Sequence, residues 1–210
     1  MHTTRGLDRL VFFTDAVSAI AITLLILPLV DSVGAAAARG LDATQFIGAN
    51  LNGIGAFALS FAVIAQLWMT HHTLFEHVKA YNRPLVLLSM LWAFTIVVLP
   101  LPTEMISQFK TSPASVGLYI GTMAVSSLAV TSMVLLIRRH AKIELTENPV
   151  TSSATSGSVI STILFFVALL IGVLIPAVNF FALLILLLGF PLQYFYGRRH
   201  TAKRATTPAN

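Results

Sequence analysis

Six apolar segments, each long enough to cross a lipid bilayer, limit what this chain of 210 residues can fold into. A membrane-spanning helix needs about 20 mostly apolar residues, because the hydrocarbon core offers the backbone no water to bond. Charged residues make up 10% of the chain, whereas a soluble domain carries roughly 25%. The sequence therefore predicts an all-α integral membrane protein with one transmembrane domain over residues 1–197. The predicted helices are 10–30, 46–70, 84–103, 115–137, 157–176 and 178–196.

The basic residues fall on one side of these segments. Eleven of the 13 lysines and arginines lie at the N-terminus, at 71–83, at 138–156 or after residue 197. Cytoplasmic loops are enriched in Lys and Arg, so we predict that both termini are cytoplasmic and that the protein lies in the cell membrane. The tail at 198–210 is basic, and we predict that it is disordered. Its basic residues could contact anionic lipid, but we prefer the interpretation that they act as a topology signal. We expect membrane lipid and no nucleic acid as partner.

The first segment has a distinct stripe of side chains. At about 100° per residue, a helix places four of them on one face, Ile20, Thr23, Leu24 and Leu27. Asp31 returns to the same face at the outer end. Arg9, eleven residues before Ile20, falls on it at the inner end if the helix is regular that far.

Two interpretations of this face remain open. The ordinary one is that its apolar side chains meet lipid or another helix. The sharper one is a pore lined by copies of the helix, where apolar rings form a constriction that can gate by dewetting. In such a pore Thr23 adds a ring of hydroxyls, and Asp31 attracts cations at the outer mouth. Because no TVGYG sequence occurs, selectivity would have to come from side chains rather than from a carbonyl filter.

Asp15 lies about 140° from Ile20, so its side chain should look into the protein. An ionisable group at the centre of a spanning helix costs ~2.5–3.5 kcal/mol on insertion scales and therefore needs a partner. We predict that Asp15 holds the first helix to the second, with a proton relay as the alternative. The candidate partners are Arg9, Trp68, His71, His72 and Arg83.

A motif surrounds this residue. Arg9 is followed by Phe13, Thr14 and Asp15, and then by the apolar stripe. This pattern resembles the first-helix signature R-x-x-x-F-S-D of a potassium-channel family, with Thr14 in place of the serine. The animal member of that family is the endosomal and lysosomal transmembrane potassium channel. Two further stretches are similar, WMTHH at 68–72 and LPLPT at 99–103.

The resemblance implies an assembly and a division of labour. Prokaryotic members of the family are homotetramers with one motif per chain, so we expect a homotetramer whose first helix lines the pore. The pore residues that it implies are Ile20, Thr23, Leu24 and Leu27. The polar network that it implies behind this helix consists of Arg9, Thr14, Asp15, Trp68, His71 and His72.

These observations favour a passive potassium channel with moderate preference for K⁺ over Na⁺. The alternative is a proton-coupled secondary transporter or a proton-conducting channel, because Asp15 lies near histidines in the prediction. We predict no enzyme, because no nucleophile–base arrangement stands out and the chain has no cysteine. Adjacent His71 and His72 point about 100° apart on a helix and suit one metal poorly. We expect neither a cofactor nor a bound metal beyond K⁺ in transit.

Overall fold

The computed structural model describes residues 4–175, 178, 182–183 and 185. In these residues the regular elements are helices, so the prediction of an all-α fold is confirmed for this part of the chain. The predicted sixth helix at 178–196 and the tail at 198–210 lie outside the described residues, apart from four single positions. The helices are α1 (Thr4–Leu24), α2 (Leu27–Ala38), α3 (Ala43–Ala49), α4 (Leu51–Phe75), α5 (Arg83–Val98), α6 (Pro100–Gln108), α7 (Pro113–Arg139) and α8 (Ser152–Leu174).

Five stretches of the described chain are helical, long and apolar enough to cross a membrane. Two of them consist of consecutive helices, α1 with α2 and α5 with α6. The length and composition of these stretches support an integral membrane protein. They are Arg5–Ala38, Leu51–Phe75, Arg83–Gln108, Pro113–Arg139 and Ser152–Leu174.

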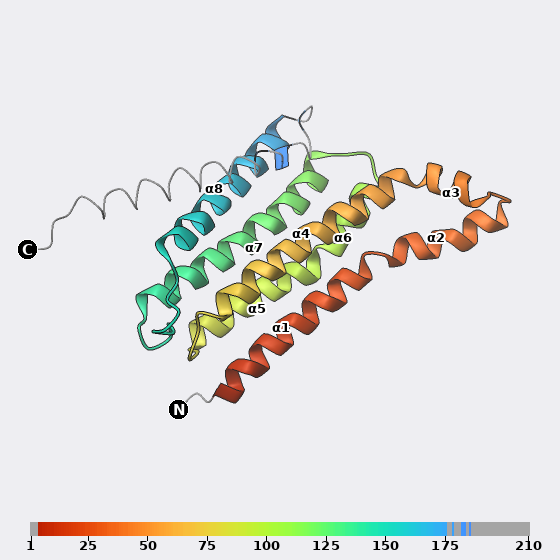
Figure 1. Cartoon of the computed structure of the whole chain (residues 1–210). Coiled ribbons are helices and arrows are strands. Elements are labelled where there is room, and N and C mark those ends of the chain that lie inside the picture. The colour runs from red at the N-terminus through yellow and green to blue at the C-terminus, as the bar shows by residue number, and fades with distance from the viewer. Residues whose placement is uncertain (1–3, 176–177, 179–181, 184, 186–210) are drawn as a thin grey trace, which may run out of the picture.

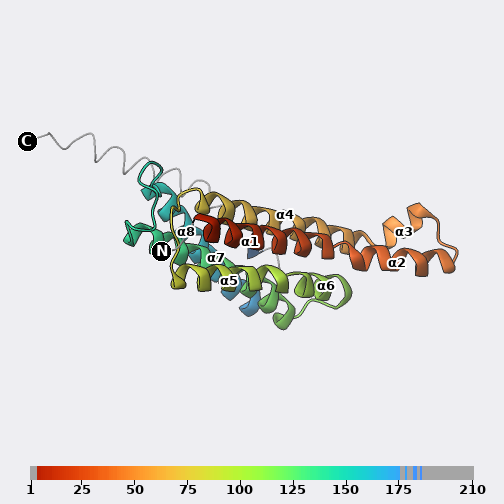
Figure 2. The same cartoon turned by 90° about the horizontal axis from the view of Figure 1, so that it is seen from below.

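The first stretch is interrupted at residues 25–26, between α1 and α2. Pro28 has no backbone N–H, so it cannot donate the helical hydrogen bond to the carbonyl of Leu24. The break falls inside the first predicted helix, 10–30, for which the stripe of side chains was derived from regular helical geometry. Beyond it, α2 continues to Ala38 and reaches past the end of α6, together with α3 (Figure 2).

A capping box begins α3, the short helix between α2 and α4. The Gln45 amide donates to Asp42 Oδ1 at 2.8 Å, and the Asp42 amide donates to Gln45 Oε1 at 3.0 Å. This reciprocal pair fixes the first turn of α3, because it satisfies two amides that have no partner within the helix. Helix α3 ends at Ala49 and Asn50 separates it from α4, so the second spanning stretch begins at Leu51, whereas the sequence analysis started it at residue 46.

The bundle is centred on α7. This helix lies between α8 on one side and α4 and α5 on the other (Figure 1), and it packs most extensively against α8 and α5. Its core side chains are fully buried, as expected for a helix surrounded by other helices. They include Ile120, Met123, Met133 and Ile137.

Hydroxyl groups join α7 to α8. Thr162 Oγ1 lies 2.9 Å from Ser127 Oγ and 2.8 Å from Thr131 Oγ1, and Thr131 also donates to the carbonyl of Ser158. Helix association in lipid depends on close packing and on hydrogen bonds between helices, since lipid is as apolar as the side chains. The triplet of Ser127, Thr131 and Thr162 therefore fixes the register of this helix pair.

Replacing Thr162 with valine should lower the stability of the purified protein by about 0.6–1.7 kcal/mol, the range measured for such bonds between membrane helices. Valine keeps the shape of threonine but removes both hydroxyl contacts. The measurement is the unfolding temperature in detergent. Thr122→Val is the matched control, because the Thr122 hydroxyl bonds only to Leu118 of its own helix. Equal unfolding temperatures for the two variants would contradict the role of the triplet.

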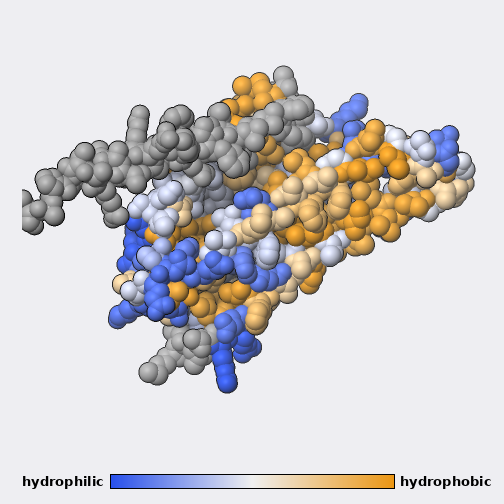
Figure 3. All heavy atoms as spheres, in the orientation of Figure 1, coloured by the Kyte–Doolittle hydropathy of each residue, from blue (hydrophilic) through white to orange (hydrophobic). Residues whose placement is uncertain are grey.

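The two ends of the bundle differ in charge. The start of α1 and the connections α4–α5 and α7–α8 meet at one end (Figure 1), and hydrophilic side chains gather there (Figure 3). The two connections are bonded to each other, with Lys79 N donating to the carbonyl of Ile143 at 2.9 Å. The described basic residues of this end are Arg5, Arg9, Lys79, Arg83, Arg138, Arg139 and Lys142.

Candidate functional site

The helix α1 has one covered face and one open face. The covered face packs against α4 and α5, and its buried residues recur every three or four positions, as one side of a helix requires. They are Leu10, Thr14, Ser18 and Ala21, and Leu25 continues the series in the turn after α1. The open face carries the stripe singled out in the sequence.

Apolar side chains dominate the open face. Ile20 is 59% exposed, Leu24 42% and Leu27 48%, although Leu27 lies beyond the break in the helix. Thr23 and Asp31 are exposed on the same segment, and the Thr23 hydroxyl donates to the carbonyl of Ile20 at 2.8 Å. Such a contiguous apolar face on one chain has to be covered by lipid or by another protein surface.

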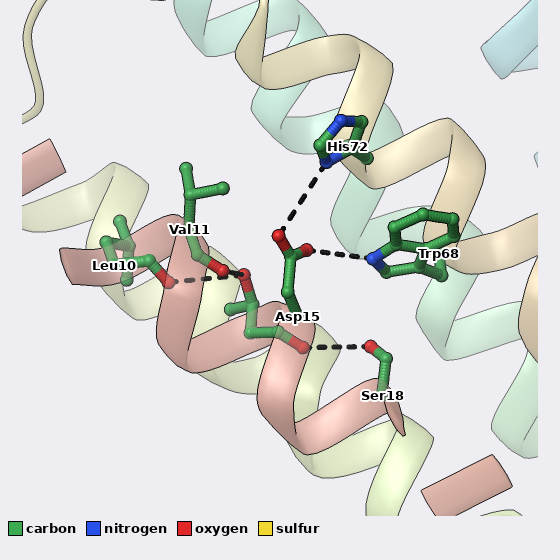
Figure 4. Close-up of polar contacts among 7 residues, drawn as sticks. Leu10, Val11, Asp15, Ser18, Trp68 and His72 are labelled. Atoms are coloured by element: carbon green, nitrogen blue, oxygen red, sulfur yellow. Dashed lines mark hydrogen bonds and ion pairs between the residues drawn. The ribbon is translucent and has the colours of Figure 1, made fainter. Parts of the chain in front are cut away.

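Asp15 connects α1 to α4 (Figure 4). Trp68 Nε1 donates to Asp15 Oδ1 at 2.8 Å, and His72 Nδ1 lies 3.8 Å from Asp15 Oδ2. Trp68 and His72 are one helical turn apart, and their rings lie 5.2 Å from centre to centre. The carboxylate therefore faces two neighbouring side chains of one helix, so this contact fixes α1 relative to α4 both along and around its axis.

Two of the five candidate partners of Asp15 contact it in the structure. Trp68 and His72 contact it, and no hydrogen bond or ion pair to Arg9, His71 or Arg83 occurs within the described part of the chain. Arg9 is exposed near the start of α1 and makes no such contact in residues 4–175.

Thr14 is completely buried, but its hydroxyl bonds within its own helix. It donates to the carbonyls of Val11 at 2.9 Å and Leu10 at 3.2 Å, while Ser18 donates to the Thr14 carbonyl at 2.9 Å (Figure 4). These bonds satisfy both hydroxyls without reaching another helix. The short side chains thus let α1 approach its neighbours closely beside Asp15.

His71 lies apart from the Asp15 contact. Its ring is fully buried and stacks on Trp92 of α5 at 3.8 Å between centres and 12° between planes, with Phe75 at 4.7 Å. Neither His71 nitrogen nor Trp92 Nε1 has a hydrogen-bond partner among the described residues. Packing on an indole is therefore the main interaction of His71, and sequence reasoning did not single out Trp92 because nothing local marks it.

The described residues hold no group of three His, Cys, Asp or Glu side chains that could bind a metal. His71 and His72, adjacent in sequence, serve different sites, one against Trp92 and the other beside Asp15. What the arrangement offers is a helix with an apolar, hydroxyl-bearing open face that is anchored from behind by a carboxylate.

The part of the chain that contains this site matches a known protein family. The sequence model of the endosomal/lysosomal potassium channel TMEM175 family matches residues 9–100, which include most of α1, all of α2–α5 and the whole of the site described above. The match therefore covers the open face, the break and the Asp15 contact together.

Relatives of named activity match slightly more than half of the chain. A potassium channel of Streptomyces collinus is 33% identical over 129 residues, 58% of this chain and 59% of the relative. The endosomal/lysosomal proton channel TMEM175 of mouse is 31% identical over 126 residues, and that of human 33% over 126 residues. These alignments cover 54% of this chain but only 24% and 23% of the mouse and human proteins.

Proposed function

We propose that this chain, whose residues 9–100 match the TMEM175 family of potassium channels, is a potassium-selective channel of that family in the cell membrane. In this proposal four copies surround a central pore, and the open face of α1 and α2 lines it. Potassium ions pass down their gradient without coupling to another solute. The preference for K⁺ over Na⁺ is moderate, because side chains rather than a carbonyl cage line the path.

The open face of the first spanning stretch carries the proposal. Ile20, Leu24 and Leu27 are between 42% and 59% exposed, while the opposite face is buried against the bundle. In a tetramer these residues would form apolar rings around the axis, a constriction that water leaves readily. Thr23 would add hydroxyl oxygens between the rings, and Asp31 would raise the local cation concentration at the outer mouth.

The proposal also includes the orientation of the chain in the membrane and its C-terminal part. Both termini are cytoplasmic, because the basic residues of the described chain gather at one end of the bundle. The spanning helix predicted at 178–196, which would complete a membrane domain of residues 1–197, and the basic tail at 198–210 stay predictions from the sequence, and we expect the tail to meet anionic lipid on the cytoplasmic side.

Proton conduction is the second candidate. The mammalian relatives are named proton channels, and His72 lies 3.8 Å from the Asp15 carboxylate, a pair of groups that can exchange a proton. A proton path would use this contact behind α1, whereas a potassium path would use the open face in front of it. The two candidates therefore predict different sensitive residues.

Flux through purified protein in liposomes tests both. We expect an outward K⁺ gradient to drive cation flux that grows linearly with concentration, and the same Na⁺ gradient to drive clearly less. A proton-selective path would instead acidify or alkalinise the liposome interior equally with either cation. Saturable flux that requires a pH gradient would contradict the channel and favour a carrier.

A further inference from the structure

A cavity of about 180 Å³ lies at the end of the bundle opposite the basic connections, between α2, the start of α4 and α6. A site needs roughly 10–15 Å³ of such space to hold one water, so this cavity has room for an ion with part of its hydration shell. Its apolar lining comes from Leu25, Pro28, Leu29, Ala49, Gly53, Ala56 and Phe57.

The rest of the lining is polar and carries one negative charge. Glu104 supplies the carboxylate, and no basic side chain lines the cavity among the described residues. The Glu104 side chain is half-buried and makes no ion pair or hydrogen bond within the described part of the chain. The neutral polar residues are Ser32, Asn50, Asn52, Thr103, Ser107 and Gln108. A half-buried carboxylate in a cavity that is otherwise lined by neutral groups attracts a cation, because it is only partly solvated.

The floor of the cavity is held in place by hydroxyls. Thr103 Oγ1 donates to Ser60 Oγ at 2.8 Å, and Ser60 Oγ lies 2.9 Å from Tyr119 Oη. This buried chain joins α6, α4 and α7 beneath Thr103, so the wall that carries Glu104 is fixed to the core of the bundle. The opposite wall is the first spanning stretch.

That opposite wall is the back of the break between α1 and α2. Leu25, Pro28, Leu29 and Ser32 line the cavity at helical spacing, whereas Leu24 and Leu27 are exposed on the other side of the same segment. The cavity therefore lies directly behind the residues that we assign to the constriction. Filling or emptying it would change the support of α2 where the helical ladder is already interrupted.

We propose that this cavity is a binding site for a small hydrated monovalent cation, held by Glu104 and separate from the conduction path. One carboxylate with neutral amide and hydroxyl oxygens suits a singly charged ion, since hard divalent cations are bound through more carboxylate oxygens. Its effect on the constriction rests on the proposed function, but the binding itself does not.

Rubidium, which replaces potassium and scatters X-rays anomalously, is the probe. In crystals of the full chain grown in rubidium chloride, we expect an anomalous peak in the cavity beside Glu104. The peak should be absent in Glu104→Gln, which keeps the shape of the side chain without its charge. It should persist in Glu147→Gln, which removes an exposed carboxylate outside the cavity. An empty cavity in the wild type, or an equal peak in Glu104→Gln, would overturn the proposal.

A solution measurement keeps the test decisive if a variant crystallises poorly. Binding to the folded protein raises its unfolding temperature, so replacing bulky N-methylglucamine by K⁺ at constant ionic strength should stabilise the wild type. Glu104→Gln and the cavity-filling Ala49→Leu should each lose most of this increase, and Glu147→Gln should keep it. An unchanged increase in both cavity variants would refute the site.

Conduction then separates the two proposals. If the cation site exists and the channel does not, the rubidium peak appears while liposomes show no flux. If the channel exists without the site, flux is present and the cavity stays empty. If both exist, Glu104→Gln should change the dependence of the flux on the K⁺ concentration at the outer side. The preference for K⁺ over Na⁺ should stay the same.

Discussion

Replacing Leu27 with alanine is expected to raise K⁺ flux by roughly tenfold, which corresponds to lowering the barrier by about 1.4 kcal/mol. The substitution removes most of an apolar side chain that is 48% exposed on the open face. In a tetramer it acts four times at one level of the pore, so the constriction widens and holds water more readily. The preference for K⁺ over Na⁺ should fall at the same time, because a wider path lets both ions keep their hydration shells.

The measurement is cation flux in liposomes at equal protein density, with K⁺ and Na⁺ compared. Leu87→Ala is the matched control, since Leu87 of α5 is 59% exposed and lies outside the open face of α1. It should leave flux unchanged. If Leu27→Ala behaved like this control, the open face would meet lipid and the pore would have to lie elsewhere.

Replacing Asp15 with alanine is expected to reduce the amount of folded, assembled protein more than it changes ion preference. The substitution removes the acceptor of the 2.8 Å bond from Trp68 and the carboxylate beside His72. Hydrogen bonds to charged groups contribute about 1.5–3 kcal/mol, and Trp68 would be left without this acceptor. The measurement is the yield and unfolding temperature of the oligomer after detergent extraction.

A double-mutant cycle isolates this contact. Trp68→Phe removes only the indole N–H donor, and the pair Asp15→Ala with Trp68→Phe should cost less than the sum of the single variants. Asp8→Asn is the control on the same helix, because Asp8 is exposed and makes no hydrogen bond or ion pair in the described residues. Normal assembly of Asp15→Ala with an altered ion preference would reverse the assignment and put Asp15 in the conduction path.

The helical spans were predictable because their signal is local. A run of apolar residues such as those of α7 or α8 is recognised from the chain itself, and its length is matched to a fixed bilayer thickness. The capping box of Asp42 and Gln45, which begins α3, is equally local, whereas the interruption at Asn50 moved the start of the second spanning stretch from residue 46 to Leu51. Pro28 carried a signal for the interruption of the first stretch, although not for the two-residue turn that precedes it.

The candidate site was predictable only in part. The motif around Asp15 marked a carboxylate that needs a partner, and five partners were compatible with its depth in the membrane. Trp68 and His72 contact it, while His71 stacks on Trp92, from a helix that no pattern linked to it. The chain of Ser60, Thr103 and Tyr119 likewise joins three helices through residues that look ordinary in sequence.

By itself, the sequence determined that this protein is a helical membrane protein, and its first-helix motif pointed to a channel family. Both depend on composition and on residues close together along the chain. Only the tertiary structure decided which face of α1 is covered, which partners Asp15 has, and that a polar cavity with Glu104 lies behind the break. These depend on how far one helix is rotated and shifted against the next. That relation is set by packing and hydrogen bonds between distant residues, and no periodicity within a single helix contains it.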